Sequence, residues 1–297
     1  MNKRPLVSPA DFASGFRKAL PACPILLGLV GLIYFFALRS SFDYKIGHFD
    51  PSLLFGLLCT SLIAGVLYAA VPAFLTKQAV SVTSVPADNV GSLFASVMGA
   101  VLSVILAVDS IRAFTPETTV VQKLEAFTLP FLALSLIFVL KEHPVRRIAA
   151  IVSVISVNLT MFSCYFDPNI PINSPVRNLT VILQASMLLV LLSEARLTFG
   201  TESWRITVPF YIFANGTASV LGGGIALGGL LSRLLTSDSA DPNLPVLRLG
   251  LYLALAVLAA SRLYALPAVC GEYREPPKKE KKPKEDGNPE DSEETEN

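Results

Sequence analysis

Residues 52–75 read SLLFGLLCTSLIAGVLYAAVPAFL, and this stretch decides the class of fold. It contains no charged side chain, and a bilayer core about 30 Å thick is crossed by about 20 helical residues. In lipid, a backbone can satisfy all of its own hydrogen bonds only as a helix or as a closed barrel. The stretch therefore predicts a transmembrane helix.

Seven further apolar stretches of similar length occur along the chain. They are residues 21–38, 90–111, 122–140, 147–166, 177–195, 207–234 and 246–267. The fourth span of the eight is the least regular, because Lys123 and Glu125 stand at its start and Pro130 lies within it, and the sixth is short. Charged residues make up only 16% of the chain, against about 25% in a soluble domain. The sequence predicts an all-α polytopic membrane helix bundle of about eight transmembrane helices.

The distribution of Lys and Arg near the span ends predicts the orientation. If the N-terminus is cytoplasmic, seventeen basic residues lie on the cytoplasmic side and seven on the other. We therefore expect a multi-pass protein of the cell membrane with both termini in the cytoplasm. Residues 1–20 form the predicted cytoplasmic N-terminal segment, and no convincing cleavage site follows it.

The C-terminal residues 269–297 form a predicted disordered, charged cytoplasmic tail. Residues 271–297 hold six basic and ten acidic side chains and almost no apolar ones, so this segment cannot bury enough surface to fold. The favoured interpretation is a solvated tail that only fixes topology. The alternatives are a contact of the lysines between residues 278 and 284 with anionic lipid, which the acidic end would weaken, or a contact with a cytoplasmic protein.

A shift of about 123 residues places spans one to four on spans five to eight. Residues 95–99 (ASVMG) then meet residues 218–222 (ASVLG). This pattern predicts two parallel four-helix halves, residues 21–140 and 141–268, related by an axis along the membrane normal, as in some transporters. The alternative is chance, because apolar helices share Ala, Val and Leu freely.

Three of the predicted spans carry faces of small and polar residues at the three- and four-residue steps of a helix. The candidate residues on these faces are Ser96 and Gly99 in the third span, Thr160 in the fifth, and Asn215, Ser219 and Gly222 in the seventh. Such faces serve either close helix packing or the lining of a solute path. The glycines at 222–224 also raise the expectation of a local unwinding of the seventh span, as in discontinuous transporter helices.

Three ionisable residues are candidates for a polar role at the membrane edge: Asp109, Glu194 and Arg196. Because they are predicted near span ends, their side chains are expected to reach water. Glu194 is expected to pair with Arg196 or with a neighbouring loop. The middle of the membrane is expected to offer amides, hydroxyls and glycine backbone, without a carboxylate, lysine or histidine.

The four cysteines form no Cys-x-x-Cys pair. Cys59 and Cys164 are predicted near the same side of the membrane, so a disulfide between them stays open. The sequence carries no motif for a metal or a cofactor, and no basic face for nucleic acid.

The residue content of the predicted spans favours some classes of function over others. The sequence has no His-Glu-x-x-His and no Gly-x-Ser-x-Gly motif, so an enzyme is not expected. The interpretation favoured is a transporter-like or permease-like protein for a neutral or amphipathic solute. The alternative is a non-transporting scaffold, sensor or assembly subunit. Expected partners are the lipid bilayer and either another membrane protein or a second copy of this chain.

Overall fold

The computed structural model describes residues 9–43, 47–76, 81–82, 89–139, 143–166, 174–199, 206–236 and 244–270. Eight helical segments in this part of the chain are long and apolar enough to cross a membrane. Seven are single helices: α2 (Ala22–Ser40), α3 (Leu53–Thr76), α4 (Val90–Arg112), α5 (Val120–Ile137), α6 (Val145–Tyr165), α7 (Pro175–Phe199) and α10 (Val246–Cys270). The predicted all-α bundle of eight spans is confirmed. The predicted tail lies outside the described residues from position 271 onward.

The remaining span is composite. It runs through α8 (Val208–Thr217), the π-helical turn η2 (Ala218–Gly222) and α9 (Gly223–Thr236). The expected local unwinding is absent, because the chain absorbs the irregularity as one wide helical turn and stays hydrogen-bonded. Such π-bulges are rare and are frequent at functional sites.

The limits of the spans shift by a few residues from the predicted ones, and two of these shifts have a structural consequence. α5 begins at Val120, because Thr119 and Gln122 form a capping box in which each side chain bonds the other residue's backbone. The polar start of this span is therefore a helix cap, and Pro130 lies inside the helix. α7 extends to Phe199, so Glu194 stands inside the helix and not at its end.

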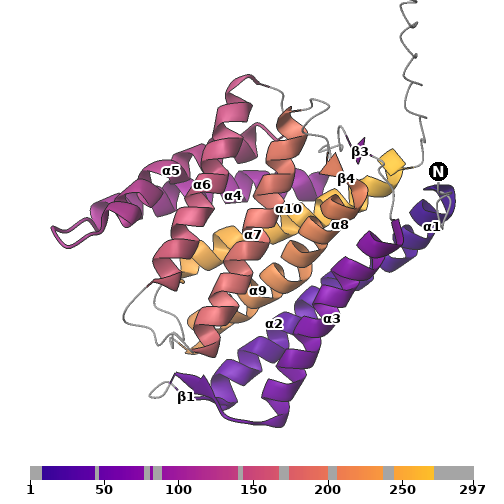
Figure 1. Ribbon diagram of the computed structural model, residues 1–297. Coiled ribbons are helices and arrows are strands. Elements are labelled where there is room, and N and C mark those ends of the chain that lie inside the picture. Colours follow the sequence, from indigo (N-terminus) through magenta and orange to yellow (C-terminus); the bar gives the residue numbers. More distant parts are fainter. Residues whose placement is uncertain are drawn as a thin grey trace, which may run out of the picture.

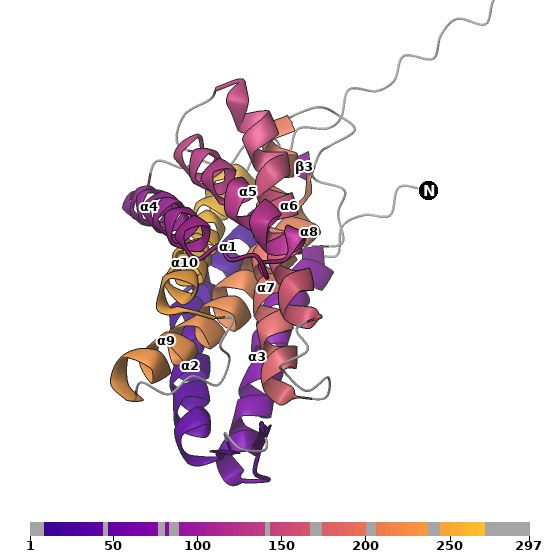
Figure 2. The same ribbon diagram turned by 90° about the vertical axis from the view of Figure 1, so that its left-hand side faces the viewer.

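The spans are arranged in three layers (Figures 1 and 2). α7, the composite span and α10 occupy the middle, with the α2–α3 hairpin on one side and α4, α5 and α6 on the other. The three middle spans are each 61% buried, whereas the other five are between 22% and 44% buried. The middle layer is thus where side chains can meet away from lipid.

A short helix, α1 (Pro9–Ala19), precedes the first span and packs on the last turns of α10. Its Phe16 is buried while Arg17 and Lys18 are exposed, so α1 turns an apolar side chain towards the bundle. The hydroxyl of Tyr264 donates to the carbonyl of Leu20 at 3.2 Å. The sequence prediction missed this helix. α1 and the last turn of α10 lie at the same end of the bundle (Figure 1), which we call the termini side, and the opposite end the distal side.

Two pairs of very short antiparallel strands join the loops. β1 (Phe42–Asp43) pairs with β2 (His48–Phe49) on the distal side. β3 (Ser81–Val82) pairs with β4 (Ile206–Thr207) and links the segment after α3 to the segment before α8. Between β1 and β2, Gly47 has a φ of 74°, a conformation that glycine adopts without strain.

The helix contacts do not support the internal repeat. In two equivalent halves, the packing of α7 on the composite span would have a counterpart between α3 and α4. No comparable packing of α3 on α4 exists among the described helices. The α2–α3 hairpin instead lies against α8, η2 and α9. The matching residues 95–99 and 218–222 therefore remain a sequence similarity between helices in different surroundings.

Candidate functional site

One face of α10, which belongs to the middle layer, carries an arginine near each end. It carries Arg248, Tyr252, Leu255, Ala259 and Arg262 at steps of four, three, four and three. These steps keep side chains on one face of a helix. Arg262 is 1% exposed and Leu255 and Ala259 are fully buried.

The facing side of α7 has the same character. Gln184, Met187, Leu191 and Glu194 follow each other at three- and four-residue steps, and each is at most 3% exposed. We call these two faces together the α7–α10 seam. Its two ends are polar and its middle is apolar.

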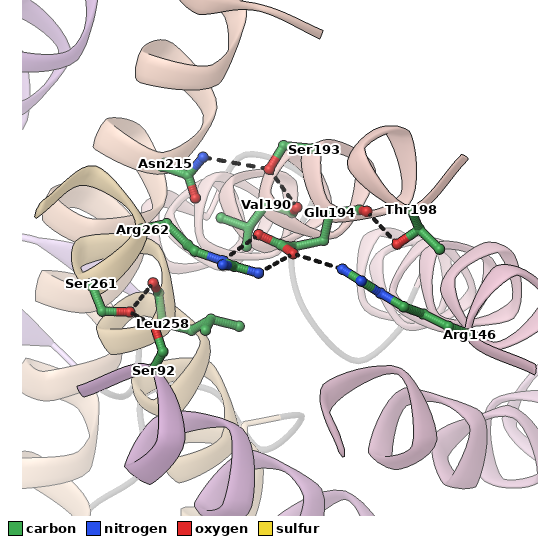
Figure 3. A network of polar contacts seen from close by, with 10 residues as sticks. All are labelled: Ser92, Arg146, Val190, Ser193, Glu194, Thr198, Asn215, Leu258, Ser261 and Arg262. Atoms are coloured by element: carbon green, nitrogen blue, oxygen red, sulfur yellow. Dashed lines mark hydrogen bonds and ion pairs between the residues drawn. The ribbon is translucent and has the colours of Figure 1, made fainter. Parts of the chain in front are cut away.

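At the termini side of the seam, Glu194 is held by two arginines from other helices (Figure 3). Arg262 donates from Nε to Oε1 at 2.9 Å and from Nη2 to Oε2 at 2.8 Å. Arg146, at the start of α6, places its Nη2 at 3.8 Å from Oε2. The two-point contact with Arg262 is the strong geometry for an arginine–carboxylate pair, and the contact with Arg146 is looser.

The position of this pair differs from the expectation of a side chain reaching water. Glu194 stands five residues before the end of α7, which is about 8 Å along the helix axis. Its side chain is only 4% exposed and that of Arg262 only 2%. Ionisable groups buried in a membrane protein are costly, and they are functional candidates by default.

A polar group of the composite span adjoins this pair. Asn215 is fully buried and donates from Nδ2 to the carbonyl of Tyr211 at 2.9 Å and to Oγ of Ser193 at 3.4 Å. Its Oδ1 has no hydrogen-bond partner among the described residues. Ser219, in the π-turn, donates to the backbone carbonyl of Asn215 at 2.6 Å. Figure 3 shows Asn215, Ser193, Glu194 and Arg262 side by side where α7, α8 and α10 meet.

At the distal side, a second ion pair closes the seam. Nη2 of Arg248 donates to Oε1 of Glu125 on α5 at 2.6 Å. Tyr252 lies next to both, and next to Cys164 and Gln184. Nε2 of Gln184 donates to the sulfur of Cys164 at 3.1 Å, and its Oε1 has no hydrogen-bond partner.

An apolar layer separates the two charged ends. Val190, Ala218 and Ala259 pack on each other in its centre. Met187, Leu191 and Leu255 extend this layer, and none of the six is more than 2% exposed. A charged or polar group would have to displace these side chains in order to pass.

Of the two predicted partners of Glu194, Arg196 is wrong, whereas Arg146, which was placed in a neighbouring loop, does contact it from the first turn of α6. Glu194 pairs with Arg262 and Arg146, whereas the guanidinium of Arg196 lies 5.3 Å from the ring centroid of Phe210. The reason is helical geometry: residues two apart point to different faces of a helix. Asp109 is exposed near the end of α4, in agreement with its predicted place.

The small and polar faces of the third, fifth and seventh spans are buried, but they do not converge. Ser96 and Gly99 lie on the face of α4 that meets α5 and α10. Thr160 donates to the carbonyl of Ser156 within its own helix at 3.1 Å. Gly222 faces Met187 and Ser186 of α7. Packing accounts for these contacts, and a ligand role for Ser96 and Thr160 remains a prediction.

Four charged residues of the site were not among the predicted site residues: Glu125, Arg146, Arg248 and Arg262. The arginines had been counted only as charges that set the orientation. The signal that could have found Arg248 and Arg262 is their spacing on one otherwise apolar face of the last span. No sequence signal identifies which carboxylate each arginine meets, because the partners are 123 and 68 residues away.

The disulfide left open between Cys59 and Cys164 is absent. Both residues are thiols in the structure, with Cys59 exposed on α3 and Cys164 buried on α6.

The chain was compared with known protein families, with curated proteins and with solved structures, and no match was found in any of the three. Any assignment of function therefore depends on the site.

Proposed function

We propose that the protein is a permease-like transporter for a neutral or amphipathic solute, and that the solute passes through the middle layer of helices. The observation that carries this proposal is the fully buried Asn215, which lies next to the π-turn. Its Oδ1 has no hydrogen-bond partner among the described residues. Leaving a buried amide oxygen unpaired costs about 1–3 kcal/mol. A solute that donates a hydrogen bond would remove this cost.

The seam supports the class of solute. Polar groups at Asn215 and Gln184 stand on either side of an apolar layer formed by residues such as Met187 and Leu255. A solute with a hydrogen-bonding head and an apolar body matches both parts. The charged residues of the seam are already engaged in ion pairs with each other, so a solute without a strong charge meets the least competition.

A non-transporting scaffold is the second candidate, and the packing of α9 favours it. Gly228 approaches the carbonyl oxygen of Gly31 so closely that an added Cβ would lie 2.5 Å from it, and Gly224 faces Val30. Close backbone approach through small residues is the usual way in which membrane helices associate tightly. A scaffold needs this rigidity, whereas a transporter must loosen part of it during its cycle.

The experiment that separates the two begins with a search for a solute. The purified protein in detergent is heated with a panel of neutral and amphipathic compounds, and compounds that raise the unfolding temperature are tested for uptake into proteoliposomes. Asn215→Ala is expected to weaken binding of any such solute without changing the pH dependence of binding, because an amide does not titrate.

Asn158→Ala is the matched control. Asn158 is also an intramembrane asparagine, but it is only partly buried and its amide bonds the carbonyl of Val154 in its own helix. If Asn215→Ala binds the solute as tightly as the parent does, Asn215 is a packing residue and the proposal loses its main support. Absence of uptake of every stabilising solute would favour the scaffold.

A further inference from the structure

The two ion pairs of the seam share one helix and one face of that helix. Arg248 and Arg262 are fourteen residues apart on α10, which corresponds to about 21 Å along the axis and to a difference in direction of about 40°. Their partners come from different helices, Glu125 from α5 and Glu194 from α7. Near each end, α10 thus forms an ion pair with another helix, and the two arginines project in nearly the same direction.

A close contact of α10 with the composite span, through small residues, lies between these two ion pairs. A Cβ added to Gly223 would stand 2.9 Å from the Cβ of Ala256, about midway between Arg248 and Arg262. The neighbouring Ala259 packs on Ala218 and Val190. Small side chains at this level leave α10 a narrow contact about which it can tilt.

We propose that the pairs Glu194–Arg262 and Glu125–Arg248 are the two gates of one solute path along the α7–α10 seam, and that they open in turn. A tilt of α10 about Ala256 moves its two ends in opposite directions. Because both arginines face the same side, the tilt that separates one pair presses the other together. This inference rests on the proposed transport function and assigns its gates.

The observed structure corresponds to the state in which both gates are closed. The 2.6 Å contact of Arg248 and the two-point contact of Arg262 seal the ends of the seam, and the apolar layer fills its middle. Opening one gate brings water to Asn215 or to Gln184, while the other gate and the apolar layer keep the membrane sealed.

Two reporter thiols test the proposal without a known solute. Cys164, beside Gln184 at the distal gate and 4% exposed, is kept as the only cysteine in the first background. In a second background without native cysteines, Ser193→Cys introduces a thiol next to Glu194, at a fully buried position. The rate of alkylation by a water-soluble maleimide is measured on the full chain in detergent.

Glu194→Gln removes the charge that holds Arg262. We expect it to raise the labelling rate at Ser193→Cys by about tenfold or more and to lower the rate at Cys164. Glu125→Gln is expected to do the reverse. Glu117→Gln, which makes the same chemical change at an exposed position between α4 and α5, should change neither rate.

A charge swap that restores an ion pair at one gate should reverse the effect of breaking it. The charge swap Glu125→Arg with Arg248→Glu restores an ion pair at the distal side, so both labelling rates should return to those of the parent. If Glu194→Gln does not yield folded protein, Arg262→Lys is used, because it keeps the charge and loses the two-point contact. The same reciprocal change of the two rates is then expected.

A rise of both rates in one variant would overturn the proposal, because it shows general loosening of the bundle. Unchanged rates in both gate variants would overturn it as well. This result is distinguishable from a failure of the proposed function. Reciprocal labelling without any transported solute would support the coupled opening of the two pairs and not the transport function. Transport without reciprocal labelling would support the transport function and show that its gates lie elsewhere.

Discussion

At the scale of the residue, the pair of Glu194 and Arg262 is the most consequential contact in the described part of the chain. Removing one partner of a buried ion pair leaves the other charge without compensation, which typically costs about 3–5 kcal/mol. We expect Arg262→Met to lower the free energy of unfolding by about this amount. The measurement is thermal or chemical unfolding of the purified protein in detergent.

The double variant Glu194→Leu with Arg262→Met is the informative comparison. Replacing both members of a buried pair by apolar side chains is often neutral or stabilising, so the double variant should recover much of the loss seen in Arg262→Met. A double variant as unstable as the sum of both single variants would show that the two residues do not act as a pair.

The residue scale is also where the sequence prediction was weakest. Glu194 was chosen as a candidate, but its partner was sought at Arg196 or in a neighbouring loop, and Arg262 was counted only among the basic residues that set the orientation. Both errors have one cause: a pattern along the chain gives the face of a helix and not the helix that lies opposite. Asn215 was found, because an amide in an apolar span is conspicuous in the sequence alone.

At the scale of the helical element, the composite span shows why glycine stripes are hard to interpret. Asn215, Ser219 and Gly222 follow each other at the steps of a regular α-helix, but η2 inserts one wide turn between residues 218 and 222. Residues before and after this turn consequently face different neighbours than a regular helix would give them.

Gly222→Leu is expected to destabilise the protein. A Cβ at this position already collides with the side chain of Met187 and stands 3.2 Å from the Cβ of Ser186, and overpacking of this kind typically costs about 1–3 kcal/mol. Thermal stability in detergent is the measurement.

A matched control for this substitution exists on α3. Gly56 has no atom within 4 Å of an added Cβ and is exposed, so Gly56→Leu should be tolerated. Leu221, a neighbour in sequence, is unsuitable as a control because it is 4% exposed and packs against Gly65. Equal unfolding temperatures of Gly222→Leu and Gly56→Leu would show that the close contact of Gly222 is not essential.

The elements themselves were predicted well from the sequence, and the physical reason is the solvent. Lipid imposes about 20 apolar residues per span whatever surrounds the helix, so the spans are visible without knowledge of the packing. Three features that lipid does not impose were missed: α1, the π-turn and the paired strands depend on neighbours distant in the chain.

At the scale of the whole molecule, the even number of spans places α1 and the end of α10 on one side. We predict that this side is the cytoplasm. An impermeant thiol reagent applied to intact cells should label neither a cysteine placed at position 2 nor one placed in the tail, and both should react after the cells are opened. Labelling of either position from outside would contradict the predicted orientation.

The position of α10 at the end of the chain bears on how the protein is made. A membrane-embedded arginine near a helix centre raises the insertion free energy by about 2.5–3.5 kcal/mol. In α10, Arg262 is buried eight residues before the end of the helix, whereas Arg248 stands in its first turn. The carboxylates that neutralise them belong to α5 and α7, which leave the ribosome earlier. The two carboxylates are therefore synthesised before the helix that carries their arginines, and a chain truncated before α10 would leave Glu125 without Arg248 and Glu194 with only the looser contact to Arg146.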